Sequence, residues 1–147
     1  KPEFTAMQDT DLEAKVSATL AALQDHDLVY LHIKAPDIFS HDRDPHGKKA
    51  FLERVDAALA RLLQEDIVIG VSADHSTDSN TGRHCGDPVP SILCAPAGRR
   101  DQCRAFGETQ CLPGGLGRIP ARAFLLTLLD EMGRMQNYST QDSQYFI

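Results

Sequence analysis

The sequence predicts an α/β fold with a mostly parallel sheet flanked by helices. Two short apolar runs, residues 28–33 and 67–73, are rich in strand-forming residues and are typical of buried strands. Between them, residues 45–63 repeat apolar positions at helical spacing. A strand, a helix and a second apolar strand in this order imply a right-handed parallel crossover whose strands are covered on both faces.

The first helix is expected over residues 11–24. Thr10 and Glu13 have the T-x-x-E spacing of a capping box, which places the helix start at Thr10. The apolar positions that follow at helical spacing are Leu12, Val16, Leu20 and Leu23.

The second helix is expected to begin with Asp44 as its N-cap and Pro45 in its first turn. Its predicted buried face consists of Phe51, Leu52, Val55, Ala58, Leu59, Leu62 and Leu63. A last helix should open at Pro120 and end at Gly133, because glycine often follows the final helical turn.

The remaining segments are polar or irregular. Residues 74–88 are expected to form a loop, and residues 89–95 a strand whose start is disturbed by Pro88 and Pro90. Residues 96–118 are rich in loop-forming residues, and the polar tail over 136–147 is expected to fray.

Composition narrows the class of protein. A length of 147 residues suits one domain, and a net charge of −6 without a basic cluster argues against nucleic-acid or anionic-membrane partners. No signal peptide is visible, and the four cysteines at 85, 94, 103 and 111 are expected to be reduced thiols, so we expect a cytoplasmic location. The chain does not begin with Met, which favours a processed, truncated or partial polypeptide.

Candidate functional residues follow the two predicted parallel strands. Ligands of open α/β sheets bind beyond the carboxyl ends of the strands. The first polar stretch carries Asp37 and His41, four residues apart, and the second carries Asp74, His75 and His84. Carboxylate and imidazole ligands suit divalent manganese, zinc or iron, and the set is large enough for two ions that share a phosphate ester.

Lys34 is the first residue of the first polar stretch, and two roles are open for it. It could contact a phosphate group, or it could be a solvated lysine at a strand end.

Three strings in this order, HIKAPDIFSHDRDP, SADHST and RHCGDPVP, resemble the cofactor-independent phosphoglycerate mutases of the archaeal-type branch. That family belongs to the alkaline phosphatase superfamily, and the later GGLGRIP string also fits it. The resemblance covers about residues 9–133 and implies an alkaline-phosphatase-like core. It also implies that residues 1–147 are the C-terminal part of the metal-binding catalytic domain, without the N-terminal part and the inserted substrate domain.

The resemblance assigns metal-binding roles. Asp37, His41 and His84 match the ligands of one divalent ion, and Asp74 and His75 match ligands of a second. Manganese is the first expectation, with magnesium, cobalt and zinc open. The family's nucleophilic serine and an N-terminal aspartate have no counterpart here, so no catalytic residue is identified and the chain alone is expected to be inactive.

The expected reaction of the parent protein is the interconversion of 2- and 3-phosphoglycerate through a phosphoserine, as part of glycolysis and gluconeogenesis. A related metalloenzyme acting on another phosphorylated compound, as a homoserine kinase, phosphatase or phosphonate-cleaving enzyme, is one alternative. A non-catalytic metal-binding or structural fragment is another. The expected partner is a small phosphorylated substrate, with no nucleic acid or membrane, and a homo-oligomer stays open.

Overall fold

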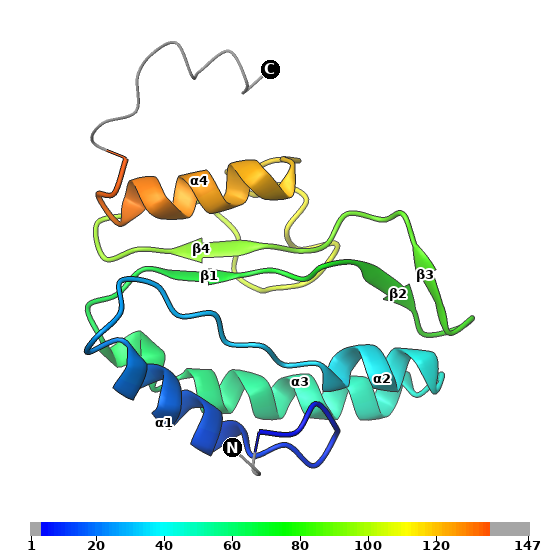
Figure 1. Cartoon of the computed structure of the whole chain (residues 1–147). Helices are drawn as coiled ribbons and strands as arrows, with labels where there is room; N and C mark the ends of the chain where they lie inside the picture. Colours follow the sequence, from blue (N-terminus) through cyan, green and yellow to red (C-terminus); the bar gives the residue numbers. More distant parts are fainter. Residues whose placement is uncertain (1–3, 136–147) are drawn as a thin grey trace. The chain divides into compact units, whose positions relative to one another are not determined.

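The computed structural model of the chain describes residues 4–135, which fall into two compact units (Figure 1). The first unit comprises residues 4–65 and 75–87, and the second comprises residues 66–74 and 88–135. None of the helices within the described residues has the length and apolar character needed to cross a membrane.

Helix α1 (Leu12–Ala22) of the first unit begins one residue later than the capping-box prediction. Its N-cap is Asp11, whose carboxylate accepts a hydrogen bond from the Ala14 amide at 2.8 Å. Thr10 instead donates its backbone N–H to Met7, which keeps it in the turn before the helix, and its buried hydroxyl has no hydrogen-bond partner. The prediction of Thr10 as the cap is therefore wrong.

Helix α3 (Pro45–Leu59) starts as predicted, because Asp44 accepts from the Gly47 amide at 2.8 Å and Pro45 occupies the first turn. Phe51 and Ala58 are buried, as is Leu62 in the short 3₁₀ helix η1 (Leu62–Gln64). Leu52 and Leu63 do not belong to the buried face, with exposed fractions of 45% and 66%. For Leu63, the tighter winding of η1 ends the 3.6-residue period on which the prediction relied.

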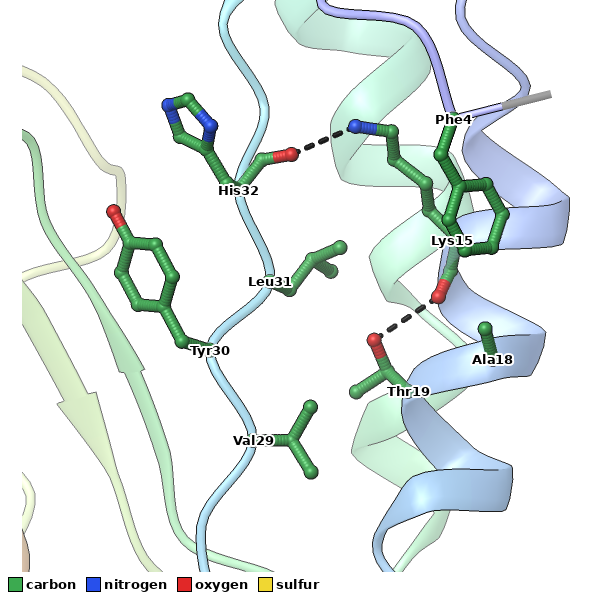
Figure 2. Close-up of a pocket in the computed structure, with 8 residues that line it drawn as sticks. All are labelled: Phe4, Lys15, Ala18, Thr19, Val29, Tyr30, Leu31 and His32. Carbon is green, nitrogen blue, oxygen red and sulfur yellow. Dashed lines mark hydrogen bonds between the residues drawn. The ribbon is translucent and has the colours of Figure 1, made fainter. Parts of the chain in front are cut away.

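Residues 28–33, predicted to be a buried strand, are neither paired nor fully buried. Val29 and Leu31 point toward α1 and line a groove beside it, whereas Tyr30 and His32 point away from α1 (Figure 2). Tyr30 is 85% exposed. The burial alternates with the period of a strand, but an extended segment becomes a strand only when a neighbour pairs with its backbone.

The second unit places helix α4 (Ala121–Glu131) over two strands, β1 (Ile69–Val71) and β4 (Ile92–Cys94). These strands pair antiparallel, with Gly70 opposite Leu93. A Cβ at Gly70 would lie 2.6 Å from Leu128 of α4, so the glycine permits the close approach of the helix. As predicted, Pro120 precedes α4, and Gly133 follows it with a φ of 68°.

The α/β class is confirmed, but the parallel arrangement is not found in the described part of the chain. Both ladders there, β1 with β4 and β2 (Ser76–Asp78) with β3 (Arg83–Cys85), are antiparallel. A parallel crossover needs a paired strand on each side of the helix, and residues 28–33 provide none. Strand β4 starts after Pro88 and Pro90, as the two prolines suggested.

The loop-rich segment of residues 96–118 is held by Asp101. Its carboxylate accepts hydrogen bonds from the backbone N–H groups of Gly115 and Cys103, each at 2.8 Å. These bonds lower the pKa of Asp101 below its usual value, because they stabilise the charged form. All four cysteines are free thiols. The tail over 136–147, predicted to fray, lies outside the described residues.

We expect Asp101→Asn to reduce hydrogen-exchange protection of the Cys103 and Gly115 amides at pH 6, since a neutral amide accepts more weakly than a carboxylate. The pKa of Asp101 is lower in the folded chain than its unfolded value of about 3.9, so its hydrogen bonds stabilise the fold fully above that pH. This stabilisation is lost as the pH falls through the folded-state pKa of Asp101. NMR exchange rates at pH 6 and below pH 3 measure both effects. Glu108→Gln, an exposed acid in the same loop, is the matched control. Equal protection in the two variants would contradict the role of Asp101.

Candidate metal centre

Helix α2 (Ala35–His41) presents Asp37 and His41 on one face. Pro36 lies in its first turn, where the missing N–H costs nothing. Residues four apart in a helix are neighbours on its surface, and His41 Nε2 lies 3.3 Å from Asp37 Oδ1. The first polar stretch of the sequence thus contains a short helix, which the sequence analysis did not predict and which brings the two residues together.

The second part of the centre is a β-hairpin where a loop was expected. Strands β2 and β3 pair with Thr77 opposite His84. Asp78 shapes the turn between them, because its carboxylate accepts from the Asn80 amide at 2.8 Å and from the Thr81 hydroxyl at 2.9 Å. These bonds lower the pKa of Asp78, so the turn is held by a charged carboxylate at neutral pH.

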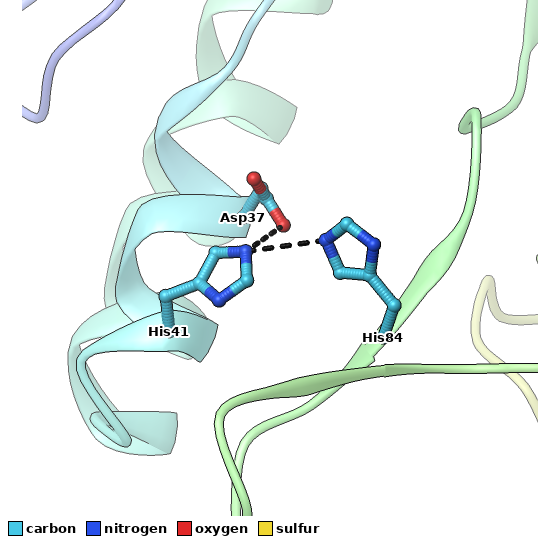
Figure 3. Close-up of side chains that lie close together, drawn as sticks. All are labelled: Asp37, His41 and His84. Carbon is cyan, nitrogen blue, oxygen red and sulfur yellow. Dashed lines mark hydrogen bonds and ion pairs between the residues drawn. The ribbon is translucent and has the colours of Figure 1, made fainter.

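The helix and the hairpin bring Asp37, His41 and His84 into one cluster (Figure 3). His84 Nε2 lies 3.3 Å from His41 Nε2, and one candidate ligand atom from each residue lies within 4.8 Å of the others. Ligands bound to a metal at about 2.0–2.2 Å in a tetrahedral arrangement are separated by roughly 3.4 Å. The measured separations therefore fit a divalent ion.

A hydrogen bond from His41 prepares its ring for ligation. Nδ1 lies 2.9 Å from the carbonyl oxygen of Gly82, and a carbonyl can only accept, so Nδ1 carries a proton. In the neutral ring, Nε2 then presents its lone pair toward Asp37 Oδ1, which is also an acceptor. This pair of atoms is held together either by a proton on Nε2, as an ion pair, or by a metal cation between them. This arrangement, in which a histidine ligand donates its other N–H to a carbonyl, is typical of metal sites.

Asp37 is kept ionised by its neighbours. Burial alone would raise its pKa, but hydrogen bonds from Lys34 and Thr77 outweigh burial, and the pKa is lowered. Lys34 Nζ donates to Asp37 Oδ2 at 2.6 Å, and Thr77 donates to Oδ1 at 2.9 Å. Lys34 thus forms an ion pair with a candidate ligand, and its side chain is 41% exposed.

The two remaining predicted ligands lie at the start of the hairpin. The His75 ring stacks on the His84 ring with centroids 3.8 Å apart, and His75 Nδ1 lies 3.2 Å from the Thr77 hydroxyl. Asp74 is exposed and belongs to the second unit. The assignment of Asp74 and His75 to a second ion stays a prediction.

Sequence reasoning missed Thr77 and Gly82. Gly82 has a φ of 69°, and a Cβ there would lie 2.9 Å from the backbone oxygen of His41. The string Ser79-Asn80-Thr81-Gly82 consists of turn-forming residues and could have indicated the hairpin. No sequence pattern indicated that the Thr77 hydroxyl would reach Asp37.

Comparison with known proteins identifies the class. The profile described as the metalloenzyme superfamily matches residues 3–131. The chain belongs to this superfamily. The family and the Asp37–His41–His84 cluster together indicate a protein that binds divalent metal.

The curated relatives of the chain within this superfamily are phosphoglycerate mutases. It is 36% identical over 138 residues to a 2,3-bisphosphoglycerate-independent phosphoglycerate mutase of Thermococcus kodakarensis, covering 91% of this chain and 34% of that protein. It is 43% identical over 129 residues to the enzyme named 2,3-bisphosphoglycerate-independent phosphoglycerate mutase 1 of Archaeoglobus fulgidus, covering 86% of this chain and 32% of that protein. The chain thus spans about a third of the length of these relatives.

A solved structure of a Pyrococcus horikoshii protein also matches. It superposes with a TM-score of 0.87 at 34% sequence identity, over 92% of this chain and 42% of the other. The resemblance inferred from the sequence strings is therefore confirmed at the level of the family and of these relatives.

We expect Gly82→Ala to destabilise the chain by about 1–2 kcal/mol, because an alanine at positive φ is strained. It should also weaken Mn²⁺ binding by about 10-fold, because the added methyl group moves the carbonyl that orients His41. Urea unfolding without metal and calorimetric titration with Mn²⁺ measure the two effects. Gly86→Ala is the matched control, since a Cβ there meets no atom within 4 Å. Unchanged Mn²⁺ affinity in the strained variant would contradict the role of this carbonyl.

Proposed function

We propose that the chain is the metal-binding part of a 2,3-bisphosphoglycerate-independent phosphoglycerate mutase. The parent protein would interconvert 2- and 3-phosphoglycerate through a phosphoserine, as an isomerase of glycolysis and gluconeogenesis. The observation that carries the proposal is the convergence of Asp37, His41 and His84. His84 lies 43 positions after His41 in the sequence, yet their side chains meet. The mutase names of relatives at 36–43% identity support the substrate.

In this proposal Asp37, His41 and His84 hold one divalent ion, and Asp74 and His75 contribute to a second. Divalent ions at such a site would polarise phosphoryl oxygens and stabilise the charge of the transferred group. His41 brings Nε2, which carries the lone pair in the neutral ring, and Asp37 brings a carboxylate kept ionised by Lys34 and Thr77. The nucleophilic serine, the N-terminal aspartate and the substrate-binding domain would belong to the rest of the parent protein.

Three finer assignments complete the proposal. Manganese is the proposed ion, because it accepts mixed carboxylate and imidazole ligands. A cytoplasmic location is supported by four free thiols, which suit a reducing compartment. Lys34 pairs with Asp37, so its first role in the proposal is to neutralise that carboxylate; its ammonium group has further N–H donors with which it would contact a substrate phosphate.

We expect the full-length parent protein to convert 3-phosphoglycerate to 2-phosphoglycerate without added 2,3-bisphosphoglycerate, to lose this activity in EDTA and to regain it with Mn²⁺. A coupled assay measures the turnover. A protein that binds Mn²⁺ but gives no turnover would move the proposal to another phosphorylated substrate. The 147-residue chain alone should give no turnover, because the resemblance assigns the nucleophilic serine to no residue of it.

We expect His84→Ala to lower Mn²⁺ affinity by more than about 10-fold, because it removes one of three converging ligands. Titration of the 147-residue chain measures the affinity. His26→Ala, which removes an exposed imidazole, is the control. Equal affinities in the two variants would exclude His84 from the site.

A further inference from the structure

We propose that Thr77 is a positioning residue whose single hydroxyl group orients Asp37 and fixes the tautomer of His75. This inference rests on the proposed function, because it takes Asp37 and His75 as metal ligands. Thr77 Oγ1 lies 2.9 Å from Asp37 Oδ1 and 3.2 Å from His75 Nδ1. It is therefore hydrogen-bonded to one proposed ligand of each ion.

The direction of these bonds follows from the protons available. An ionised carboxylate only accepts, so the one hydroxyl proton of Thr77 goes to Asp37 Oδ1. The hydroxyl oxygen can then accept but no longer donate toward His75. The contact with His75 is a hydrogen bond only if His75 Nδ1 carries the proton, which leaves the lone pair of the neutral ring on Nε2.

This chain of bonds gives His75 the same tautomer that the Gly82 carbonyl gives His41. In both rings Nδ1 donates to a fixed oxygen and Nε2 is the atom prepared for ligation. The histidine ligands of the two proposed ions thus have their tautomers set by different partners. Thr77 links His75, a proposed ligand of the second ion, to Asp37, a proposed ligand of the first.

The backbone keeps Thr77 in this position. It lies on β2 directly opposite His84, so the two side chains share a face of the hairpin. Its β-branched side chain has few rotamers, and Asp37 and His75 both lie within reach of the observed one. Ser76, the preceding residue on β2, points to the opposite face of the strand.

The test uses the 147-residue chain and compares Thr77→Val, which replaces the hydroxyl with a methyl group of similar shape, with Thr77→Ser, which retains it. Long-range ¹H–¹⁵N NMR without metal reports which ring nitrogen of His75 carries the proton, and Mn²⁺ titration reports affinity. We expect Thr77→Val to remove the preference for the Nδ1–H tautomer and to weaken Mn²⁺ binding by about 10–100-fold, and Thr77→Ser to restore both. Ser76→Ala, with circular dichroism as a check on folding, is the matched control and should change neither.

The outcomes separate this inference from the proposed function. Normal Mn²⁺ binding and an unchanged His75 tautomer in Thr77→Val would overturn the positioning role and leave the metal site intact. A wild-type chain that binds no Mn²⁺ would overturn the metal site and this inference together. Loss of the tautomer preference and of affinity in Thr77→Ser as well as in Thr77→Val would show that shape rather than the hydroxyl matters, which also contradicts the proposal.

Discussion

The hydrogen bond from His41 to the Gly82 carbonyl joins the two elements on which the candidate centre depends. It links the end of helix α2 to the turn of the β2–β3 hairpin, and it decides which imidazole nitrogen faces Asp37. Only a residue without a Cβ tolerates both the left-handed backbone and the close approach to the His41 carbonyl. The Thr77 hydroxyl adds a second hydrogen bond between the hairpin and the helix, to Asp37, so the two contacts together hold His84 beside Asp37 and His41.

Features that depend on neighbouring residues were predictable from the sequence. The Asp44 cap, the Pro45 start of α3 and the Gly133 stop of α4 all act within one helical turn, and the structure confirms them. The errors arose where two options compete or where distant segments must pair. Thr10 and Asp11 are both good caps, and the chain uses Asp11. Residues 28–33 have the composition and burial period of a strand, but pairing depends on a partner that local pattern cannot supply.

In the candidate site too, some features were predictable from the sequence and others depend on contacts between distant segments. Asp37, His41 and His84 could be named from the chemistry of their side chains and their positions after apolar segments, and the structure brings these three together. The groups that orient them could not be named so. A backbone carbonyl at Gly82 and the hydroxyl of Thr77 gain their roles only from the fold, because threonine and glycine occur throughout proteins without such partners. Sequence therefore identified the atoms that could bind an ion better than the atoms that set their direction.

Each of the two units is built from two separate stretches of chain. Residues 66–74 belong to one unit and residues 75–87 to the other, so the polypeptide passes between them three times within the described part. In genetic terms, a single truncation cannot separate either unit from the segment of the other that interrupts it. A fragment that ends before residue 84 carries two of the three clustered ligands. Recombination that exchanges the hairpin with that of a relative would need two junctions, one on each side of residues 75–87. The ligand set is thus inherited together with the segment of the second unit that interrupts it.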